Sequence, residues 1–169
     1  MDTLRSPTMG RAEVLGIDFC GVTNIGSDDF YQNDPRGVPP MAGAFKVLPR
    51  LSRKRFGENI WVISAAGPRK QKKTRDWFEC HDGYARMLIP PEHVLFSPDR
   101  AGKAEVCKKI GVTHFIDDRL EILLNLDQQV IKYLFRPSDL DRERQRRQFP
   151  DSIHVVDSWQ EVGRVLLPE

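Results

Sequence analysis

Three carboxylates in the sequence follow apolar runs that have the length of buried strands. Asp18 ends the run over residues 14–17, and Asp117 and Asp118 follow the run over residues 113–116. In open α/β sheets, ligands bind at the carboxyl ends of the strands. Carboxylates gathered at that edge would form an oxygen-rich site for a hard cation such as Mg²⁺.

A hydroxyl group and an ammonium group complete this set. Ser64 ends the apolar run over residues 60–63, and Lys103 opens a helical pattern directly after Gly102. A cation at the carboxylates would neutralise a phosphate, Lys103 would add positive charge, and Ser64 would offer a hydroxyl and a backbone amide to a phosphoryl oxygen. A carboxylate beside such a phosphoryl group can attack it in line, and water can then hydrolyse the aspartyl-phosphate.

Each of these residues also has a purely structural explanation. A serine after a strand is usually a turn residue, and a lone lysine is usually solvated. Asp117 and Asp118 can cap a helix that begins near Arg119. The chemical interpretation rests on the whole set, because the order and the placement of its members agree.

The elements that must position these residues alternate along the chain. Short β-branched runs and stretches of helical period follow one another, which predicts a parallel sheet with helices on both faces. Strands are expected at residues 13–19, 60–64, 94–96, 114–117, 130–135 and 153–156. Helices are expected at residues 43–56, 69–80, 102–110, 119–126 and 158–166. The segment 24–43 is predicted to be a long loop, a kind of segment that is often functional in compact domains.

The composition is that of a globular protein. The chain has 169 residues, of which 40% are hydrophobic and 30% are charged. We expect a flexible N-terminus over residues 1–12 and a single domain over residues 13–169. No apolar stretch approaches the roughly 20 residues that span a bilayer, and residues 1–9 lack the apolar core of a secretory signal. A cytoplasmic protein without a membrane partner is therefore expected.

The net charge of +2 hides an uneven distribution of charge. Residues 49–75 carry nine Lys or Arg and one acid, whereas residues 18–34 carry four Asp and no base. Such a run is usually a solvated face, and the alternative is a surface for a phosphorylated or polyanionic partner. Because the bases do not alternate with aromatic residues, as in single-strand binding platforms, the pattern supports nucleic acid only weakly.

The ordered set resembles the motifs of the haloacid dehalogenase-like hydrolase superfamily over residues 14–167. The first motif of that family, D-x-D-x-T/V, is matched by the run Asp18-Phe19-Cys20-Gly21-Val22. The second motif, a Ser or Thr that ends a strand, looks like Ser64. The third motif looks like Lys103, and the acidic pair of the fourth motif looks like Asp117-Asp118.

The resemblance implies a three-layer α/β/α fold with a Rossmann-like, doubly wound parallel sheet, and a Mg²⁺-dependent phosphohydrolase. Asp18 would be the nucleophile and a metal ligand. The phosphoryl oxygens of a phosphorylated substrate would be bound by Ser64, Ala65 and Lys103. The metal site would be completed by Asp117, Asp118 and the backbone carbonyl of Cys20.

Cys20 departs from the family pattern, because phosphatases of this family have a second Asp at that position. That Asp protonates the leaving oxygen and later activates water. A thiol with a usual pKa of about 8.5 is a poor match for this task, and losing general acid-base help typically costs about 10²–10⁴-fold in rate. Two interpretations stay open, namely a slow or specialised phosphatase and a non-catalytic module that binds phosphate or polyanions. Dehalogenation is less favoured, because it does not need the acidic pair.

Neither interval that holds a cap domain in this family has room for a large one. The first contains the 24–43 loop and one helix, and the second, over residues 65–102, fits a helix and a strand. A capless member resembles those that act on macromolecular or large substrates, or that close the site with a partner chain. Arg69 and Lys70, at the start of the helix after Ser64, could then meet a phosphate-rich substrate.

Overall fold

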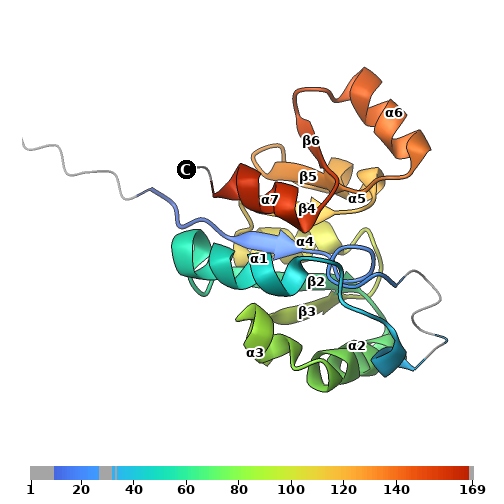
Figure 1. Cartoon of the computed structure of the whole chain (residues 1–169). Helices are drawn as coiled ribbons and strands as arrows, with labels where there is room; N and C mark the ends of the chain where they lie inside the picture. Colours follow the sequence, from blue (N-terminus) through green and yellow to red (C-terminus); the bar gives the residue numbers. More distant parts are fainter. Residues whose placement is uncertain (1–9, 27–31, 33, 168–169) are drawn as a thin grey trace, which may run out of the picture.

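A parallel β-sheet forms the centre of the molecule (Figure 1). The structure is a computed structural model that describes residues 10–26, 32 and 34–167. Six strands of this part of the chain form one sheet in the order β3-β2-β1-β4-β5-β6, with every neighbouring pair parallel. The strands are β1 (Leu15–Ile17), β2 (Ile60–Ala65), β3 (Val94–Ser97), β4 (His114–Asp117), β5 (Ile131–Phe135) and β6 (Ile153–Val156). The order reverses between β1 and β4, where open α/β sheets bind their ligands.

Helices cover both faces of the sheet and bury two hydrophobic cores. One face carries α1 (Ala44–Leu51), α2 (Pro68–Cys80), α3 (Gly83–Met87) and α7 (Trp159–Leu166), which pack against one another. The other face carries α4 (Lys103–Ile110) and α5 (Leu120–Asn125). The strands are buried on both sides, as their continuous apolar runs predict. The three-layer α/β/α architecture and the doubly wound sheet are therefore confirmed.

The observed elements differ from the expected ones at two helices and at several ends. The helix α6 (Asp139–Gln148) and the short helix α3 were not predicted. The helix expected over residues 43–56 is α-helical only in α1 and continues as a π-helical turn over Ser52–Phe56. The strand β1 is shorter than the expected segment 13–19.

The described residues contain no insertion of the size of a cap domain. Between β1 and β2 they form a short 3-10 turn (Pro35–Gly37), α1 and the π-helical turn, and between β2 and β3 they form α2, α3 and a 3-10 turn (Pro91–His93). Part of the predicted 24–43 loop, and residues 1–9 of the expected flexible N-terminus, lie outside the described residues. The single domain over residues 13–169 stays a prediction. No described helix is both long enough and apolar enough to cross a membrane.

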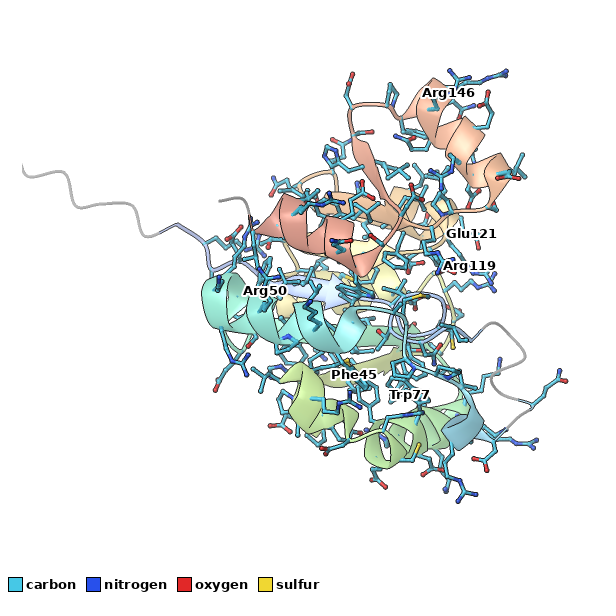
Figure 2. All side chains as sticks on the ribbon, in the orientation of Figure 1. Phe45, Arg50, Trp77, Arg119, Glu121 and Arg146 are labelled. Carbon is cyan, nitrogen blue, oxygen red and sulfur yellow. The ribbon has the colours of Figure 1, made fainter. Side chains whose placement is uncertain are left out.

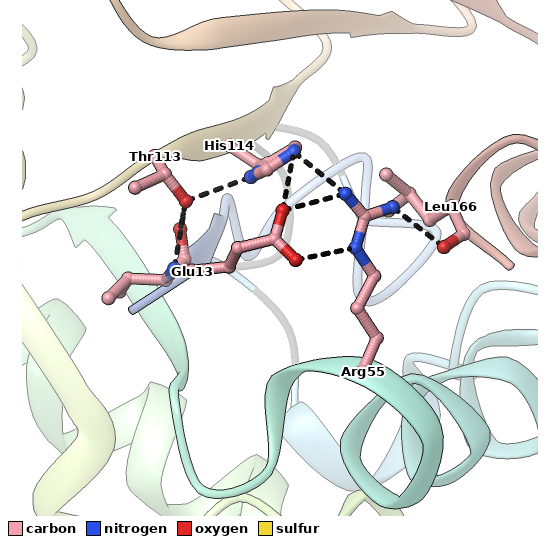
Figure 3. A network of polar contacts seen from close by, with 6 residues as sticks. Glu13, Arg55, Thr113, His114 and Leu166 are labelled. Carbon is pink, nitrogen blue, oxygen red and sulfur yellow. Dashed lines mark hydrogen bonds and ion pairs between the residues drawn. The ribbon is translucent and has the colours of Figure 1, made fainter. Parts of the chain in front are cut away.

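A polar network fixes the edge of the sheet where the strands begin (Figure 3). Arg55, at the end of the π-helical turn, donates to both carboxylate oxygens of Glu13, at 3.1 and 2.7 Å, and to the carbonyl of Leu166, at 2.7 Å. The same guanidinium lies 3.3 Å from Nε2 of His114. Because arginine can only donate, Nε2 accepts, and the imidazole proton resides on Nδ1, 2.8 Å from the hydroxyl oxygen of Thr113. His114, a neighbour of the acidic pair in sequence, therefore faces the edge of the sheet opposite to it.

Candidate active site

Three carboxylates meet where β1 and β4 end. Asp18 follows β1, Asp117 is the last residue of β4, and Asp118 comes next; each offers an oxygen within 4.8 Å of the others. The backbone around Asp18 is fixed, because its amide donates to the carbonyl of Ile116 at 2.9 Å and its carbonyl accepts from the Thr23 hydroxyl at 2.7 Å. The adjacent parallel strands β1 and β4 thus bring together the acidic positions that the sequence predicted.

Lys103 lies against these carboxylates at the first residue of α4. Its ammonium group donates to Oδ1 of Asp18 at 2.6 Å and to Oδ2 of Asp117 at 2.8 Å, and its side chain is only 3% exposed. Burial alone would lower the pKa of Lys103, but the charges of Asp117 and Asp18 outweigh burial and raise this pKa. The lysine is therefore held in its charged form at the bottom of the site.

The single ammonium group of Lys103 does not neutralise three carboxylates, so an excess of negative charge remains in the site. Burial, with the charge of Asp18 added, raises the pKa of Asp117 to about 6 and that of Asp118 to about 8. Oδ1 of Asp118 is buried and has no hydrogen-bond partner among the described residues. A bound divalent cation would supply both the missing partner and the missing positive charge, so these residues fit a Mg²⁺ site.

Gly21 makes room for Asp118. Its φ angle is +83°, a backbone conformation that side chains other than hydrogen rarely adopt. A Cβ atom at this position would lie 2.4 Å from Oδ2 of Asp118. Gly21 is therefore needed both for the turn after Asp18 and for the position of the Asp118 carboxylate.

The remaining predicted site residues lie around the same opening. A cavity of about 630 Å³ is lined by every residue that the sequence placed in the site, namely Asp18, Cys20, Ser64, Ala65, Lys103, Asp117 and Asp118. Ser64 and Ala65 end β2, which pairs with β1 on the side away from β4. Oδ1 of Asp117 also has a structural role, since it accepts from the amide of Arg119 at 3.0 Å and so fixes the turn before α5, but α5 itself has no side-chain cap.

Sequence reasoning missed several residues that shape the site. Thr23 is buried and bonds to Asp18, and its position soon after the first motif was the only available signal. Asp99 and Arg100 line the cavity from the turn after β3. Oδ1 of Asp99 accepts from the amide of Gly102 at 2.7 Å and so fixes the turn that begins α4. The Asp-x-x-Gly spacing before Lys103 is a turn signal that could have identified this contact.

Among the comparisons with known proteins, the one with solved structures identifies similar folds. No family model matches the chain, and no curated protein matches it. Among solved structures, D,D-heptose 1,7-bisphosphate phosphatase from B. bronchiseptica, in complex with magnesium and phosphate, matches with a TM-score of 0.66 and 16% identity over 92% of this chain and 98% of that one. The phosphatase of the same name from Burkholderia thailandensis matches with a TM-score of 0.63 and 11% identity, over 93% and 99% of the two chains. The chain therefore shares the fold of these two phosphatases, as the resemblance of its four motifs implied.

Proposed function

We propose that this protein is a Mg²⁺-dependent hydrolase of phosphomonoesters that acts through an aspartyl-phosphate on Asp18. The observation that carries the proposal is the position of Asp18, which lines the cavity, contacts Lys103 and lies within reach of a cation held by Asp117 and Asp118. The fold supports the same function, because the two similar structures are phosphatases and one of them holds magnesium and phosphate.

The residues of the chain divide the chemistry between them. A carboxylate oxygen of Asp18 attacks phosphorus, the bond from phosphorus to the leaving oxygen breaks, and water then attacks the phosphoryl group and regenerates Asp18. Lys103, together with the hydroxyl of Ser64 and the backbone amide of Ala65, stabilises the charge on the phosphoryl oxygens. Asp18, Asp117, Asp118 and the backbone carbonyl of Cys20 would hold the cation, which would supply Lewis acidity and neutralise phosphate charge.

Cys20 limits which substrates react fast. Cys20 lines the cavity, at the position where phosphatases of the superfamily that the motifs resemble have the Asp that protonates the leaving oxygen. A leaving group that departs without a proton, as from an acyl or aryl phosphate, needs that acid least. We therefore expect a measurable rate with activated phosphates and a slow rate with simple alkyl phosphates.

The test is hydrolysis of an activated aryl phosphate with and without Mg²⁺. The wild type is expected to release phosphate only with Mg²⁺, and Asp18→Asn is expected to lose this turnover. Cys20→Asp restores an acid and is expected to raise the rate on an alkyl phosphate by about 10²-fold or more. Turnover by Asp18→Asn at the wild-type rate would show that another residue is the nucleophile.

The second candidate function is a binding module that keeps the phosphate pocket without turnover, and the observation that favours it is the thiol of Cys20. It predicts that the wild type binds phosphate in the presence of Mg²⁺ but hydrolyses no phosphomonoester, and that Cys20→Asp gains activity. Hydrolysis by the wild type at a rate that Cys20→Ala does not change would exclude it.

A further inference from the structure

A side chain from α6 holds the end of the turn that carries Asp118. Oδ2 of Asp141, in the first turn of α6, accepts from the backbone amide of Leu120 at 3.1 Å. Leu120 is the first residue of α5 and follows Asp118 by two positions. The two partners are 21 residues apart, so the contact joins two helices that β5 separates along the chain. Figure 2 shows Arg119 and Glu121, the neighbours of Leu120, at the end of the molecule where α6 lies.

Both backbone amides that follow Asp118 are therefore bound by carboxylates. The amide of Arg119 donates to Oδ1 of Asp117 at 3.0 Å, and the next amide donates to Asp141. The side chain of Arg119 does not cap α5, so Asp141 supplies from another helix the acceptor that an N-cap residue usually supplies. Hydrogen bonds from backbone amides to carboxylates are among the stronger ones in proteins. The path of the chain after Asp118 thus depends on one residue of the site and on one outside it.

Asp141 is itself held in place by the contacts of α6. Its amide donates at 3.2 Å to the hydroxyl of Ser138, the N-cap residue of α6. One turn further along, Gln145 is buried and its side-chain amide donates to the carbonyls of Phe149 and Ile153, at 3.3 and 2.7 Å. Ile153 is the first residue of β6, an edge strand of the sheet. The carboxylate of Asp141 is therefore presented by an element that is tied to the sheet.

The carboxylate of Asp118 has little room to move without losing its place in the site. A Cβ atom at Gly21 would lie 2.4 Å from its Oδ2, so a shift towards the turn after β1 is blocked. A shift in the other direction would separate it from the oxygens of Asp18 and Asp117, which now lie within 4.8 Å of its own. Mg²⁺ demands near-ideal octahedral geometry, at about 2.0–2.1 Å from its ligand oxygens. A small displacement of this turn should therefore weaken metal binding.

We propose that Asp141 is a positioning residue of the metal site, which acts through the amide of Leu120 to hold Asp118 where it can bind the cation. The proposal rests on the proposed function, because the site must bind Mg²⁺ for this position to matter. Groups that orient metal ligands from outside the ligand set typically contribute about 10- to 100-fold to metal affinity. The proposal also gives a role to α6, a helix that buries only Gln145.

The experiment measures Mg²⁺ affinity by titration calorimetry for the wild type, Asp141→Ala and Asp141→Asn. Alanine removes the acceptor, whereas asparagine keeps an acceptor oxygen in the same place. Asp139→Ala removes an exposed carboxylate from the same helical turn and is the control for charge. Arg55→Met, in the polar network at the opposite edge of the sheet, is the control for a general loss of stability. Hydrogen exchange of the Leu120 amide, followed by NMR without metal, reports the contact itself.

We expect Asp141→Ala to bind Mg²⁺ about tenfold more weakly than the wild type and to exchange the Leu120 amide faster. Asp141→Asn should recover most of this loss, and Asp139→Ala and Arg55→Met should bind the metal as the wild type does. Unchanged affinity or unchanged amide exchange in Asp141→Ala would overturn the proposal. A loss of the same size in Asp141→Asn, or in either control, would overturn it as well.

Failure of this proposal is distinguishable from failure of the proposed function, because metal binding is measured without turnover. If the aryl phosphate is hydrolysed with Mg²⁺ but Asp141→Ala binds the metal as the wild type does, the proposal alone fails. If no phosphomonoester is hydrolysed but the wild type binds Mg²⁺, the affinities of the variants still decide the role of Asp141. A wild type that binds no Mg²⁺ would contradict both.

Discussion

Asp118 destabilises the folded chain in the absence of a cation, although the proposed function requires it. This half-buried carboxyl lies beside Asp18 and Asp117; burial, with the charges of these two residues added, raises its pKa, and its buried Oδ1 has no hydrogen-bond partner among the described residues. Removing a buried charge from a like-charged cluster relieves repulsion. A bound cation would neutralise this repulsion, and the same three carboxylates would be its ligands.

We predict opposite effects of Asp118→Asn with and without Mg²⁺. Without the metal, the variant should have a free energy of unfolding about 1 kcal/mol higher than the wild type, because the repulsion is gone. With saturating Mg²⁺, the wild type should gain stability according to the ratio of metal concentration to Kd, and the variant should gain little. Chemical denaturation at both conditions measures this, with Asp151→Asn on the surface as the control. An equal gain for all three proteins would place the metal elsewhere.

Gly21 gives a second test at the residue scale. Gly21→Ala must place its Cβ against Oδ2 of Asp118, whereas Gly57→Ala, at a φ of +57°, meets no atom within 4 Å. Both variants should lose about 1–3 kcal/mol of stability, because each places a side chain at a positive φ angle. Only Gly21→Ala should also weaken Mg²⁺ binding, which titration calorimetry measures. Equal Mg²⁺ affinities in the two variants would contradict the proposed role of Gly21.

At the scale of elements, the contacts of Arg55 help to fix the π-helical turn after α1. Arg55 joins this turn to Glu13, just before β1, and to the last turn of α7 (Figure 3). Arg55→Met should therefore lower the free energy of unfolding by about 1–3 kcal/mol. Arg53→Met, at an exposed position on the same turn, is the control and should change it by less than about 0.5 kcal/mol. Similar losses in both variants would mean that the network adds no stability.

The same network predicts how stability depends on pH. Burial, followed by the charge of Arg55, lowers the pKa of His114 below 6.5. Below pH 6.5 the unfolded chain then binds more protons than the folded one, so this contribution to stability is complete above that pH and is lost as the pH falls. Urea denaturation between about pH 7.5 and 5 should show a smaller acid-induced loss for His114→Gln than for the wild type. A parallel loss in both proteins would remove His114 as the cause.

Apolar periodicity explains which elements the sequence could predict. The strands and the helices α1, α2, α4, α5 and α7 bury apolar faces, and their patterns predicted them within a few residues. The helix α6 is polar apart from the exposed Leu140 and buries only Gln145, whose amide donates to the carbonyls of Phe149 and Ile153. Its start is fixed by the Ser138 hydroxyl, which accepts from the amide of Asp141. No apolar pattern could reveal a helix held by caps and one side-chain amide.

At the scale of the whole molecule, the basic segment 49–75 does not form one surface. Because α1 and α2 connect parallel strands, the bases at the end of α1 lie at the edge where strands begin, and those at the start of α2 lie at the opposite edge. Arg55 belongs to the polar network of the first edge, and Arg69 and Lys70 line the cavity at the second. The sequence left open one surface for a polyanionic partner beside the usual solvated face, and the crossover of the chain places these bases at two edges of the sheet. The positions of the acidic site residues could be predicted because each ends a strand or adjoins its end. Asp99, Arg100 and Arg119, in contrast, line the cavity from turns whose geometry the sequence does not reveal.

Covalent phosphorylation of Asp18 can be detected by mass spectrometry of acid-quenched protein. The protein is mixed with an aryl phosphate and Mg²⁺, quenched within the first turnover, digested and compared with Asp18→Asn. We expect the mass of one phosphoryl group on the wild-type peptide that contains Asp18, and none on the variant. Phosphate release by the wild type without this adduct, or with the adduct on another residue, would show that Asp18 is not the nucleophile.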